Sequence, residues 1–544
     1  MAWGCKGAVS APHLFAAQAA IDVLRSGGNA VDAAVAAAAV STVVQPFSSS
    51  AGGVGWATVY DRALQKTEVL QFHGAVPAGL DPDCFSSAPS GLVDWKALEA
   101  AGKALLGSLV PGTVAGWAEL LARKGRWSLA RALEIAASLA FEGFPVSELL
   151  HEILKQNMGK LSRWPASARI FLPHGRLLVP GERLVQADLG STLERIGNNG
   201  PAEVVAGQTG EALVDLYCQY GGVLSASDLS AYRPMWYQPL VTTFRGHVVH
   251  AAPAPLGDVS FVSGLSLLEA LSDRAGSDYQ WSGCVEPGPG HAGPLDPAYV
   301  SASVESAKIV NAERRRYLGP GAGKATVDRL LGADHVRALS ERVALRASGG
   351  PMPPSADEHT ITLAVVDEDG NAANIMQTVG TFFGTGAVAE GTGVLANSCL
   401  YFAYAGNKGA NRVVPGRGIE QNPCLITVFD RDGNLELVLG SPGGRTRVET
   451  VRQMLVNVLD FGMNIQQAVD APRFLSGADG KSVDFEHRYG PLAPELCAAL
   501  EARGYAVRYV DDAFGSGQAV AIDPVSRTRM AAADWRRESV ALAY

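Results

Sequence analysis

Two β-hairpins that share the same turn constrain the fold of this 544-residue chain more than any other feature. In the first, β-branched and apolar residues fill 359–366, the turn Asp-Glu-Asp-Gly-Asn follows at 367–371, and a second strand covers 372–379. The pattern recurs as a strand at 425–429, the turn Asp-Arg-Asp-Gly-Asn, and a strand at 435–439. Both turns resemble half of a calcium loop, but the later ligands and flanking helices of an EF-hand do not follow. A turn of this composition between two strand-like runs instead predicts a β-hairpin in each place.

The first half of the chain is predicted to be mainly helical. Apolar residues recur at helical spacing over residues 12–52 and predict two packed helices. Further helices are expected from Pro111 to about Leu154, and Ser225 has the residue type that caps a helix start. The glycine-rich stretch 50–55 superficially resembles a phosphate loop, but a strand follows it and the sequence lacks the Gly-Lys-Ser/Thr of such loops.

Composition and charge exclude several classes of protein. The net charge of −9 without a basic stripe argues against a nucleic-acid partner, and the compact basic run that starts at Arg314 is typical of a solvated helix face. The N-terminus lacks the basic and long apolar regions of a signal peptide, so we expect a cytoplasmic protein. The apolar segment 30–44 is too short to span a bilayer, which predicts a buried helix and no membrane anchor. Seven widely spaced cysteines without a Cys-x-x-Cys pair argue against a disulfide framework or a zinc site, and no metal or cofactor is expected.

An exposed loop is predicted to meet a strand at Thr360. Residues 347–357, like 286–297, are rich in Pro, Gly and Ser and predict loops at the surface. A threonine hydroxyl is a weak nucleophile unless a base lies beside it; at a free N-terminus that base is the α-amine, with an ordinary pKa of about 7.7–8.0. Cleavage of the His359–Thr360 bond would create such an N-terminus where a loop can open without disturbing a core. Taken alone, a threonine at a strand start more often serves only as a β-former.

A second candidate element follows the second hairpin. Residues 440–444, Gly-Ser-Pro-Gly-Gly, lie between the strand at 435–439 and a segment at 448–461 with helical spacing. Loops between a strand and a helix N-terminus point backbone N–H groups at anions, although the same residues also form ordinary turns.

Four motifs in a fixed order give the chain a resemblance to the γ-glutamyltranspeptidase family along nearly its whole length. They are Gly27–Ala36, Val110–Trp117, Phe383–Gly386 and Gly440–Gly444. The spacing from Thr360 to the Val-Asp pair at 366–367 also matches the start of the family's small subunit. The resemblance implies an α/β (α+β) fold, the four-layer αββα sandwich of N-terminal-nucleophile hydrolases, and a precursor that cuts itself. Residues 1–359 then form a large (α) subunit segment, mainly helical plus strands, and 360–544 a small (β) subunit segment, both interleaved in one unit.

The resemblance also assigns catalytic roles. Thr360 is the nucleophile, and the cleavage site lies between His359 and Thr360. Thr378 matches a threonine that hydrogen-bonds the nucleophile, and Gly443 and Gly444 match the pair whose backbone N–H groups form the oxyanion hole. Two donors aimed at a developing oxyanion contribute about 3–4 kcal/mol apiece, by analogy with measured oxyanion-hole deletions.

The residues with which the family holds the α-carboxylate and α-amine of a glutamyl group are not kept. His73 stands where the family has an arginine, Gly380 where it has an asparagine, and Phe402 where it has an amine-binding aspartate. The family's Ser-Ser pair reads Ile419-Glu420 in this chain. Substrate charges without partners cost binding energy, so γ-glutamyl compounds are expected to be poor substrates.

The other residues near these positions indicate a different acyl group. Cys399 and the aromatic pair that ends at Phe402 favour a more apolar group. Arg445 and Arg447, just past the oxyanion glycines, can meet a carboxylate such as an oxalyl or dicarboxylate end, although such arginines are more often at the surface or paired with Asp or Glu. His73 is either a polar pocket residue or a hydrogen-bonded structural histidine. The predicted substrate pocket comprises His73, Gly380, Cys399, Phe402, Glu420 and Arg445.

The nucleophilic machinery is retained while the specificity pocket has changed. We therefore expect an autoprocessed threonine-nucleophile hydrolase, an amide hydrolase or acylase that acts on a small non-γ-glutamyl substrate through an acyl-enzyme. One alternative is a C–C bond hydrolase of the same fold in natural-product biosynthesis; another is an uncleaved, catalytically silent protein that binds a metabolite. The expected partners are a small-molecule substrate and the two subunits of one precursor, with a higher oligomer and acyl transfer to an amine left open.

Overall fold

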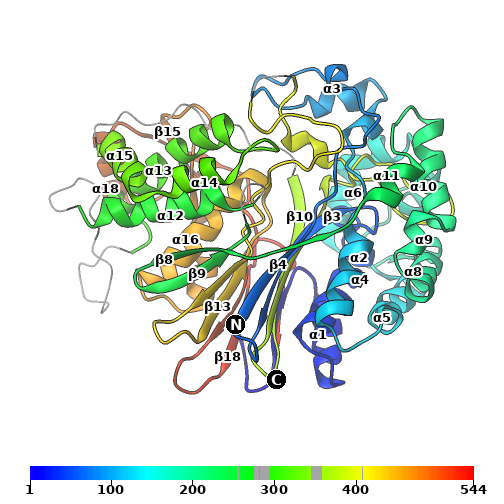
Figure 1. Cartoon of the computed structure of the whole chain (residues 1–544), viewed down its shortest axis with the longest axis horizontal. Coiled ribbons are helices and arrows are strands. Elements are labelled where there is room, and N and C mark those ends of the chain that lie inside the picture. Colours follow the sequence, from blue (N-terminus) through cyan, green and yellow to red (C-terminus); the bar gives the residue numbers. More distant parts are fainter. Residues whose placement is uncertain (254–256, 275–280, 282–292, 345–357, 407–408) are drawn as a thin grey trace.

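Two antiparallel seven-stranded sheets lie face to face, and helices cover the outer face of each (Figure 1). This is the predicted four-layer αββα arrangement, which is confirmed. The structure is a computed structural model that describes residues 1–253, 257–274, 281, 293–344, 358–406 and 409–544. The loop predicted at 347–357 and most of the loop predicted at 286–297 therefore lie outside the described residues.

We name the two large sheets after strands near their centres. From edge to edge, the β10 sheet consists of β19 (Val540–Ala543), β2 (Ala8–Ala11), β10 (Glu358–Val366), β11 (Ala372–Thr381), β3 (Val54–Asp61), β4 (Lys66–Phe72) and β7 (Met235–Tyr237). The β13 sheet consists of β1 (Ala2–Gly4), β18 (Arg529–Ala533), β17 (Gln518–Ile522), β13 (Leu435–Gly440), β12 (Ile426–Phe429), β9 (His247–Ala251) and β8 (Leu240–Phe244). Two small sheets contain β14 (Phe474–Ser476), β15 (Ser482–Glu486) and β16 (Ala506–Val510), and β5 (Phe144–Pro145) with β6 (Arg183–Leu184).

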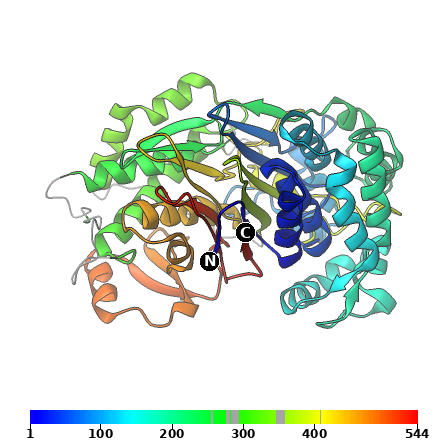
Figure 2. The same ribbon diagram turned by 90° about the horizontal axis from the view of Figure 1, so that it is seen from below.

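The helices divide between the two outer faces, as the view from below also shows (Figure 2). On the side of the β10 sheet lie α1 (Leu14–Arg25), α2 (Ala30–Val44), α4 (Thr113–Lys124), α5 (Leu129–Glu142), α6 (Glu148–Leu161), α7 (Pro165–Phe171), α8 (Ala187–Asn199), α9 (Ala202–Val205), α10 (Gln208–Gln219) and α11 (Ala226–Ala231). On the side of the β13 sheet lie α12 (Val259–Ser272), α13 (Pro297–Tyr317), α14 (Lys324–Leu331), α15 (Ala333–Ala344), α16 (Arg447–Leu459), α17 (Ile465–Asp470) and α18 (Pro494–Ala502). The short α3 (Trp95–Ala100) lies at the top of Figure 1. In the described part of the chain, no helix combines the length and the apolar character needed to cross a membrane.

Each large sheet combines strands from both sides of the His359–Thr360 bond. The β10 sheet takes β2, β3, β4 and β7 from the segment before this bond, and the β13 sheet takes β1, β8 and β9. The two ends of the chain also lie side by side (Figure 1), and the N–H of Lys6 donates to the carbonyl of Tyr544 at 2.8 Å. The segments on the two sides of the bond therefore share one hydrogen-bonded framework.

The space between the two sheets holds an apolar layer with a few polar contacts. The rings of Tyr60 and Phe429 lie 4.9 Å apart in an edge-to-face arrangement. The hydroxyl of Thr58 donates to the carbonyl of Leu425 at 3.2 Å, and the amide of Asn374 donates to the carbonyl of Leu439 at 3.0 Å. Each contact joins the two sheets, so they fix how the sheets are aligned at the level of the hairpins.

Helix α2 is apolar on all sides and is buried along its whole length of 15 residues, as expected of a central helix. Asn29 caps its N-terminus, and Asp32 completes a capping box by accepting from the N–H of Asn29 at 2.8 Å. The same Asp32 carboxylate accepts from the N–H groups of Arg126 and Trp127 at 2.9 and 3.0 Å. One buried carboxylate thus fixes α2 and the connection between α4 and α5.

The hairpins and most of the other predicted elements are confirmed. The first hairpin is β10 with β11 and the second is β12 with β13. In each turn the first aspartate, Asp367 or Asp430, accepts a hydrogen bond from the backbone N–H of the asparagine four residues later. The pair of helices predicted over 12–52 corresponds to α1 and α2, and Ser225 caps α11 through a capping box. The helix predicted at 448–461 is α16, which begins one residue earlier.

The Asp32 contacts predict a large effect on stability. Asp32→Ala removes a capping-box acceptor and leaves three backbone N–H groups without their carboxylate, so we expect a loss of about 3 kcal/mol and a melting temperature about 3 °C lower. The control is Asp22→Ala, which removes an exposed aspartate from α1. Differential scanning calorimetry checks both variants, and equal melting temperatures for the two would contradict the role given to Asp32.

Candidate active site

Thr360 lies near the start of β10, at the end of the hairpin opposite its turn. Its pairing partner is Thr378 on β11, so both side chains project from the same face of the sheet. The register shifts between His359 and Thr360, and the extra residue on β11 is Val379, whose N–H donates to the carbonyl of Ser48 at 3.1 Å. Such an irregularity re-aims the neighbouring side chains. Thr360 and Thr378 are each only 3% exposed.

The two threonine hydroxyls form a short hydrogen-bond chain that ends on the predicted cleavage site. Thr360 Oγ1 donates to Thr378 Oγ1 at 3.2 Å, and Thr378 Oγ1 donates to the carbonyl oxygen of His359 at 2.6 Å. Thr378 Oγ1 also accepts from the N–H of Gly380 at 2.9 Å. One donated and two accepted bonds saturate the Thr378 hydroxyl, which fixes its orientation. Hydrogen bonds thus connect the predicted nucleophile, its predicted partner and the carbonyl of the predicted cleavage site.

The Gly443–Gly444 loop lies beside this strand. Gly443 has φ 127° and Gly444 has φ 50°, and both values lie in the region that favours glycine. A Cβ on Gly443 would come within 2.7 Å of Thr446 Oγ1 and 3.0 Å of the Cα of Gly515, so the position has no room for a side chain. The loop continues into a 3-10 turn, η5 (Gly444–Thr446), which contacts β10. For the described residues, no backbone carbonyl accepts from the N–H of either glycine, so both donors can serve an anion.

Arg447, the first residue of α16, contacts the Thr360 hydroxyl directly. Its Nη2 donates to Thr360 Oγ1 at 3.2 Å and its Nη1 donates to the carbonyl of Asn422 at 2.8 Å. The side chain is among the largest fully buried ones, with 1% exposure. The sequence suggested a carboxylate-binding role for this arginine; the structure places its guanidinium on the hydroxyl itself.

The buried groups that interact electrostatically with Arg447 include His73 and Asp258. His73 follows β4 and is completely buried, and neither ring nitrogen has a partner among the described residues. Burial, and then the charge of Arg447, lower the pKa of His73 to about 3, so the ring is neutral at pH 7. Burial raises the pKa of Asp258 to about 7, against the opposing effects of the N–H groups of Cys424 and Ala252 and of Arg447.

Three of the predicted pocket residues line one small cavity. The cavity of about 40 Å³ is lined by Leu92, Asn311, Arg314, Arg315, Phe402, Tyr404, Asn411, Glu420 and Arg445. Phe402, Glu420 and Arg445 therefore come together although they are distant in sequence. Burial raises the pKa of Glu420, while Arg314, whose Nη2 lies 2.7 Å from its Oε2, opposes this rise.

The pairing of Arg314 with Glu420 corrects the expectation that the basic run at 314–316 is a solvated helix face. Arg314 turns inward from α13, and its side chain is 20% exposed while that of Glu420 is 1% exposed. Arg316 is exposed, whereas Arg314 and Arg315 are half-buried. The correction has a simple physical reason, because a buried Glu420 needs a cation and α13 is the element that supplies one.

The other three predicted pocket residues, His73, Gly380 and Cys399, do not line that cavity. Gly380 and Cys399 lie next to Thr378. Gly380 has φ 98°, and a Cβ there would be 2.5 Å from Ser398 Oγ, so a larger residue cannot stand here without moving Ser398. The Cys399 thiol lies 4.0 Å from the carbonyl of Thr378, and burial raises the pKa of this thiol well above its usual value. Gly380 and Cys399 therefore contact the backbone around Thr378 and form no part of the cavity wall.

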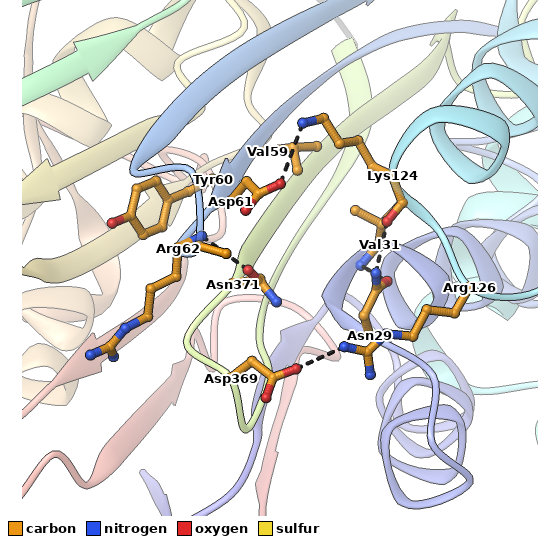
Figure 3. A pocket seen from close by; sticks show the side chains of 11 residues that line it. Asn29, Val31, Val59, Tyr60, Asp61, Arg62, Lys124, Arg126, Asp369 and Asn371 are labelled. Atoms are coloured by element: carbon orange, nitrogen blue, oxygen red, sulfur yellow. Dashed lines mark hydrogen bonds and ion pairs between the residues drawn. The ribbon is translucent and has the colours of Figure 1, made fainter.

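A larger surface cavity lies at the other end of the hairpin (Figure 3). It has a volume of about 510 Å³, and Arg126 pairs with Asp369 at 2.8 Å and Lys124 with Asp61 at 3.5 Å along its wall. None of the predicted site residues lines it. At a rise of about 3.3 Å per residue, the strand separates it from Thr360 by about 20 Å. It is not the candidate active site.

Sequence reasoning missed the contact of Arg447 with Thr360, the carbonyl of Asn422 that holds the guanidinium, and the electrostatic interaction of Arg447 with Asp258. The available signal for Arg447 was its place three residues after the glycine pair, at the predicted start of a helix. Nothing in the sequence marked Asp258, which only the fold brings near.

Comparisons with known proteins agree with this geometry. A sequence model of the gamma-glutamyltranspeptidase family matches residues 16–544. The glutathione hydrolase proenzyme of Escherichia coli (strain K12) is 31% identical over 546 residues, which cover 95% of this chain and 88% of that protein. The acylase ACY 1 proenzyme of Pseudomonas sp. (strain SE83) is 30% identical over 549 residues, covering 99% and 94% of the two chains. The crystal structure of cephalosporin acylase from Bacillus halodurans is similar with a TM-score of 0.83 and 25% identity, covering 100% of this chain and 96% of that one.

The Arg314–Glu420 pair makes the cavity wall sensitive to mutation. Glu420→Ala leaves Arg314 without its carboxylate in a largely buried place, and we expect a loss of about 2–3 kcal/mol of stability. The control is Glu390→Ala, which breaks an exposed ion pair with Arg169 and is expected to change stability by less than about 0.5 kcal/mol. Thermal unfolding followed by circular dichroism compares the variants. Similar losses of stability in both would contradict a larger stabilising contribution from the Arg314–Glu420 pair.

Proposed function

Because the chain belongs to the γ-glutamyltranspeptidase family, we propose that it is an N-terminal-nucleophile hydrolase made as a precursor, which cuts the His359–Thr360 bond and then uses Thr360 on the amide carbonyl of a small non-γ-glutamyl substrate. In this proposal, 1–359 and 360–544 are the large and small subunit segments. Residues His359, Thr360, Thr378, Gly443 and Gly444 carry the chemistry.

The observation that carries the proposal is the hydrogen-bond chain from Thr360 Oγ1 through Thr378 Oγ1 to the His359 carbonyl oxygen. A hydroxyl that donates to a carbonyl oxygen polarises it for attack. In the cleavage step, Thr360 Oγ1 bonds to the His359 carbonyl carbon, the C–N bond to Thr360 breaks, and the Thr360 nitrogen takes up the proton. Water then hydrolyses the resulting ester, which releases the His359 carboxylate and frees the Thr360 amine and hydroxyl.

Substrate turnover uses the same atoms a second time. The free α-amine of Thr360 accepts the hydroxyl proton as Oγ1 attacks the substrate carbonyl. The N–H groups of Gly443 and Gly444 donate hydrogen bonds to the negative oxygen that forms. Collapse of this intermediate breaks the C–N bond, and the leaving amine takes the proton held by the α-amine. Water then attacks the acyl-enzyme ester and restores Thr360.

The named relatives support amide hydrolysis after processing. One is called a glutathione hydrolase proenzyme and another an acylase proenzyme, and the similar crystal structure is of a cephalosporin acylase. All three names belong to enzymes that act on amide bonds, and two describe a precursor. Among the described pocket residues, Phe402 is uncharged and Glu420 is already paired to Arg314, so neither offers a free carboxylate to the α-amine of a glutamyl group.

Self-cleavage is tested by the intact mass of the purified protein under denaturing conditions. We expect two fragments, the smaller beginning at Thr360, and a single uncut chain for Thr360→Ala because its nucleophilic oxygen is gone. Thr362→Ala is the matched control, since Thr362 is also buried on β10 and its hydroxyl has no partner among the described residues. This control variant is expected to be cut like the wild type.

A wild-type protein that remains one chain would contradict the proposal. That result would favour the alternative of a silent protein that binds a metabolite in the same cleft. Cleavage of the Thr360→Ala variant would also contradict it, because another group would then perform the cut.

Substrate preference is tested with two anilides that differ only in the α-amine. We expect glutaryl-p-nitroanilide to be hydrolysed with a kcat/KM at least about tenfold above that of γ-glutamyl-p-nitroanilide, because the carboxylate beside Phe402, Glu420, is already paired with Arg314 and is not free for an ammonium group. Release of p-nitroaniline measures both. Equal or better turnover of the γ-glutamyl compound would show that the glutamyl-binding function survives.

A further inference from the structure

The contact between Arg447 and Thr360 joins two buried groups that the proposed mechanism does not otherwise connect. Arg447 Nη2 lies 3.2 Å from Thr360 Oγ1, and the side chain is 1% exposed. Among the described residues, no carboxylate lies within ion-pair distance of this guanidinium, and its Nε has no hydrogen-bond partner. A fully buried arginine normally finds a carboxylate, as Arg473 and Arg536 do in this chain through Asp534 and Glu486.

The guanidinium is held in place from the other side. Its Nη1 donates to the carbonyl of Asn422 at 2.8 Å, and its backbone forms the first residue of α16, directly after η5. Two of its donors therefore have fixed and different targets, a backbone oxygen and the reacting hydroxyl. This geometry distinguishes Arg447 from Arg445, which lines the small cavity beside Phe402.

The charged and titratable groups around this point come from several elements. Asp258 at the start of α12 and His73 after β4 interact with Arg447 electrostatically, and so does the Cys424 thiol before β12. On β10, His359 is partly buried, and desolvation and then the charge of Arg537 lower its pKa. Since His73 and His359 are neutral at pH 7, Arg447 is the cation that hydrogen-bonds Oγ1, and Asp258 is the acidic group nearby.

A fixed cation has two effects on a threonine at a chain start. It favours negative charge on the hydroxyl oxygen, and it disfavours a positive charge on an amine nearby. Covalent geometry keeps the Thr360 nitrogen within about 4 Å of its own Oγ1, so after cleavage the same guanidinium acts on both groups. An arginine keeps its proton throughout, and so it can act only through its field and hydrogen bonds.

We infer that Arg447 is a further catalytic residue, whose guanidinium stabilises negative charge on Thr360 Oγ1 and keeps the adjacent α-amine in its neutral, proton-accepting form. This inference rests on the proposed function. In the acylation step, Oγ1 forms its bond to the acyl carbon while its proton passes to the α-amine. The carbonyl electron pair moves to the oxygen facing Gly443 and Gly444, and the leaving group departs with the proton or as its own anion. Arg447 exchanges no proton at any point.

The test follows acylation of the purified, cleaved enzyme by p-nitrophenyl acetate as a function of pH. The readouts are the burst of p-nitrophenolate and a mass increase by one acetyl group on the fragment that begins at Thr360. Loss of the cation in Arg447→Gln is expected to move the inflection of the rate profile up by about one pH unit and to slow acylation at pH 7 about tenfold. Arg447→Lys, which keeps a charge, is expected to remain near the wild-type inflection.

Arg452→Gln is the matched control. Arg452 is also buried on α16, and its Nη2 donates to the carbonyl of Ser303 at 3.2 Å, away from Thr360. Its removal tests whether the loss of any buried arginine from this helix changes the profile. We expect the inflection to stay where it is in the wild type.

The outcomes separate the two proposals. A wild type that is neither cut nor acetylated on Thr360 overturns the proposed function. A wild type that is cut and acetylated, with an unchanged inflection in Arg447→Gln, overturns the role of Arg447 alone. If Arg447→Gln folds but is not cut while Arg447→Lys is cut, the charge is needed already for processing, which supports the inference. Loss of cutting in both folded variants alike would contradict a role of charge.

Discussion

The pairing of β10 with β11 is the constraint on which the rest of the site depends. This pairing sets Thr360 opposite Thr378, and the register shift beside it turns the Thr378 hydroxyl onto the carbonyl of His359. A slip of one residue would send the Thr360 side chain to the opposite face of the sheet, away from Arg447 and the glycine loop. The hairpin turn at Asp367, the contacts of β11 with β3 and the burial of α2 against both strands all keep that register.

The same framework allows the chain to remain one unit after the proposed cut beside the buried Thr360. Both large sheets mix strands from the two sides of the His359–Thr360 bond, and the chain ends meet at Lys6 and Tyr544. Hydrogen bonds across these strands, and the apolar layer between the sheets, do not depend on that bond. Opening it changes the chemistry of Thr360 while the neighbours of its side chain stay where the sheets hold them.

The parts of the fold that could be predicted from sequence are those set by local pattern. The hairpins, α1, α2 and the glycine loop follow from residue spacing and turn composition within a few residues. Arg314 and Arg447 could not be placed in this way, because their partners are 106 and 87 residues away along the chain. An arginine on a helix carries no local mark of the face it occupies; here a buried Glu420 and a buried hydroxyl decide it. Of the predicted pocket, the residues at 402, 420 and 445 line one cavity, whereas Gly380 and Cys399 contact the backbone around Thr378 and His73 is buried within the electrostatic reach of Arg447.

The central claim is that Thr360 becomes a free N-terminal nucleophile held between Thr378 and Arg447. Electron density from a crystal of the purified wild-type protein tests it most directly, because it shows the bond and the surrounding side chains together. The account predicts a chain break after His359, a free Thr360 amine close to Oγ1, and Arg447 still within hydrogen-bond distance of that oxygen. Continuous density from His359 to Thr360 in the purified protein, or an Arg447 side chain turned away from Thr360, would contradict it.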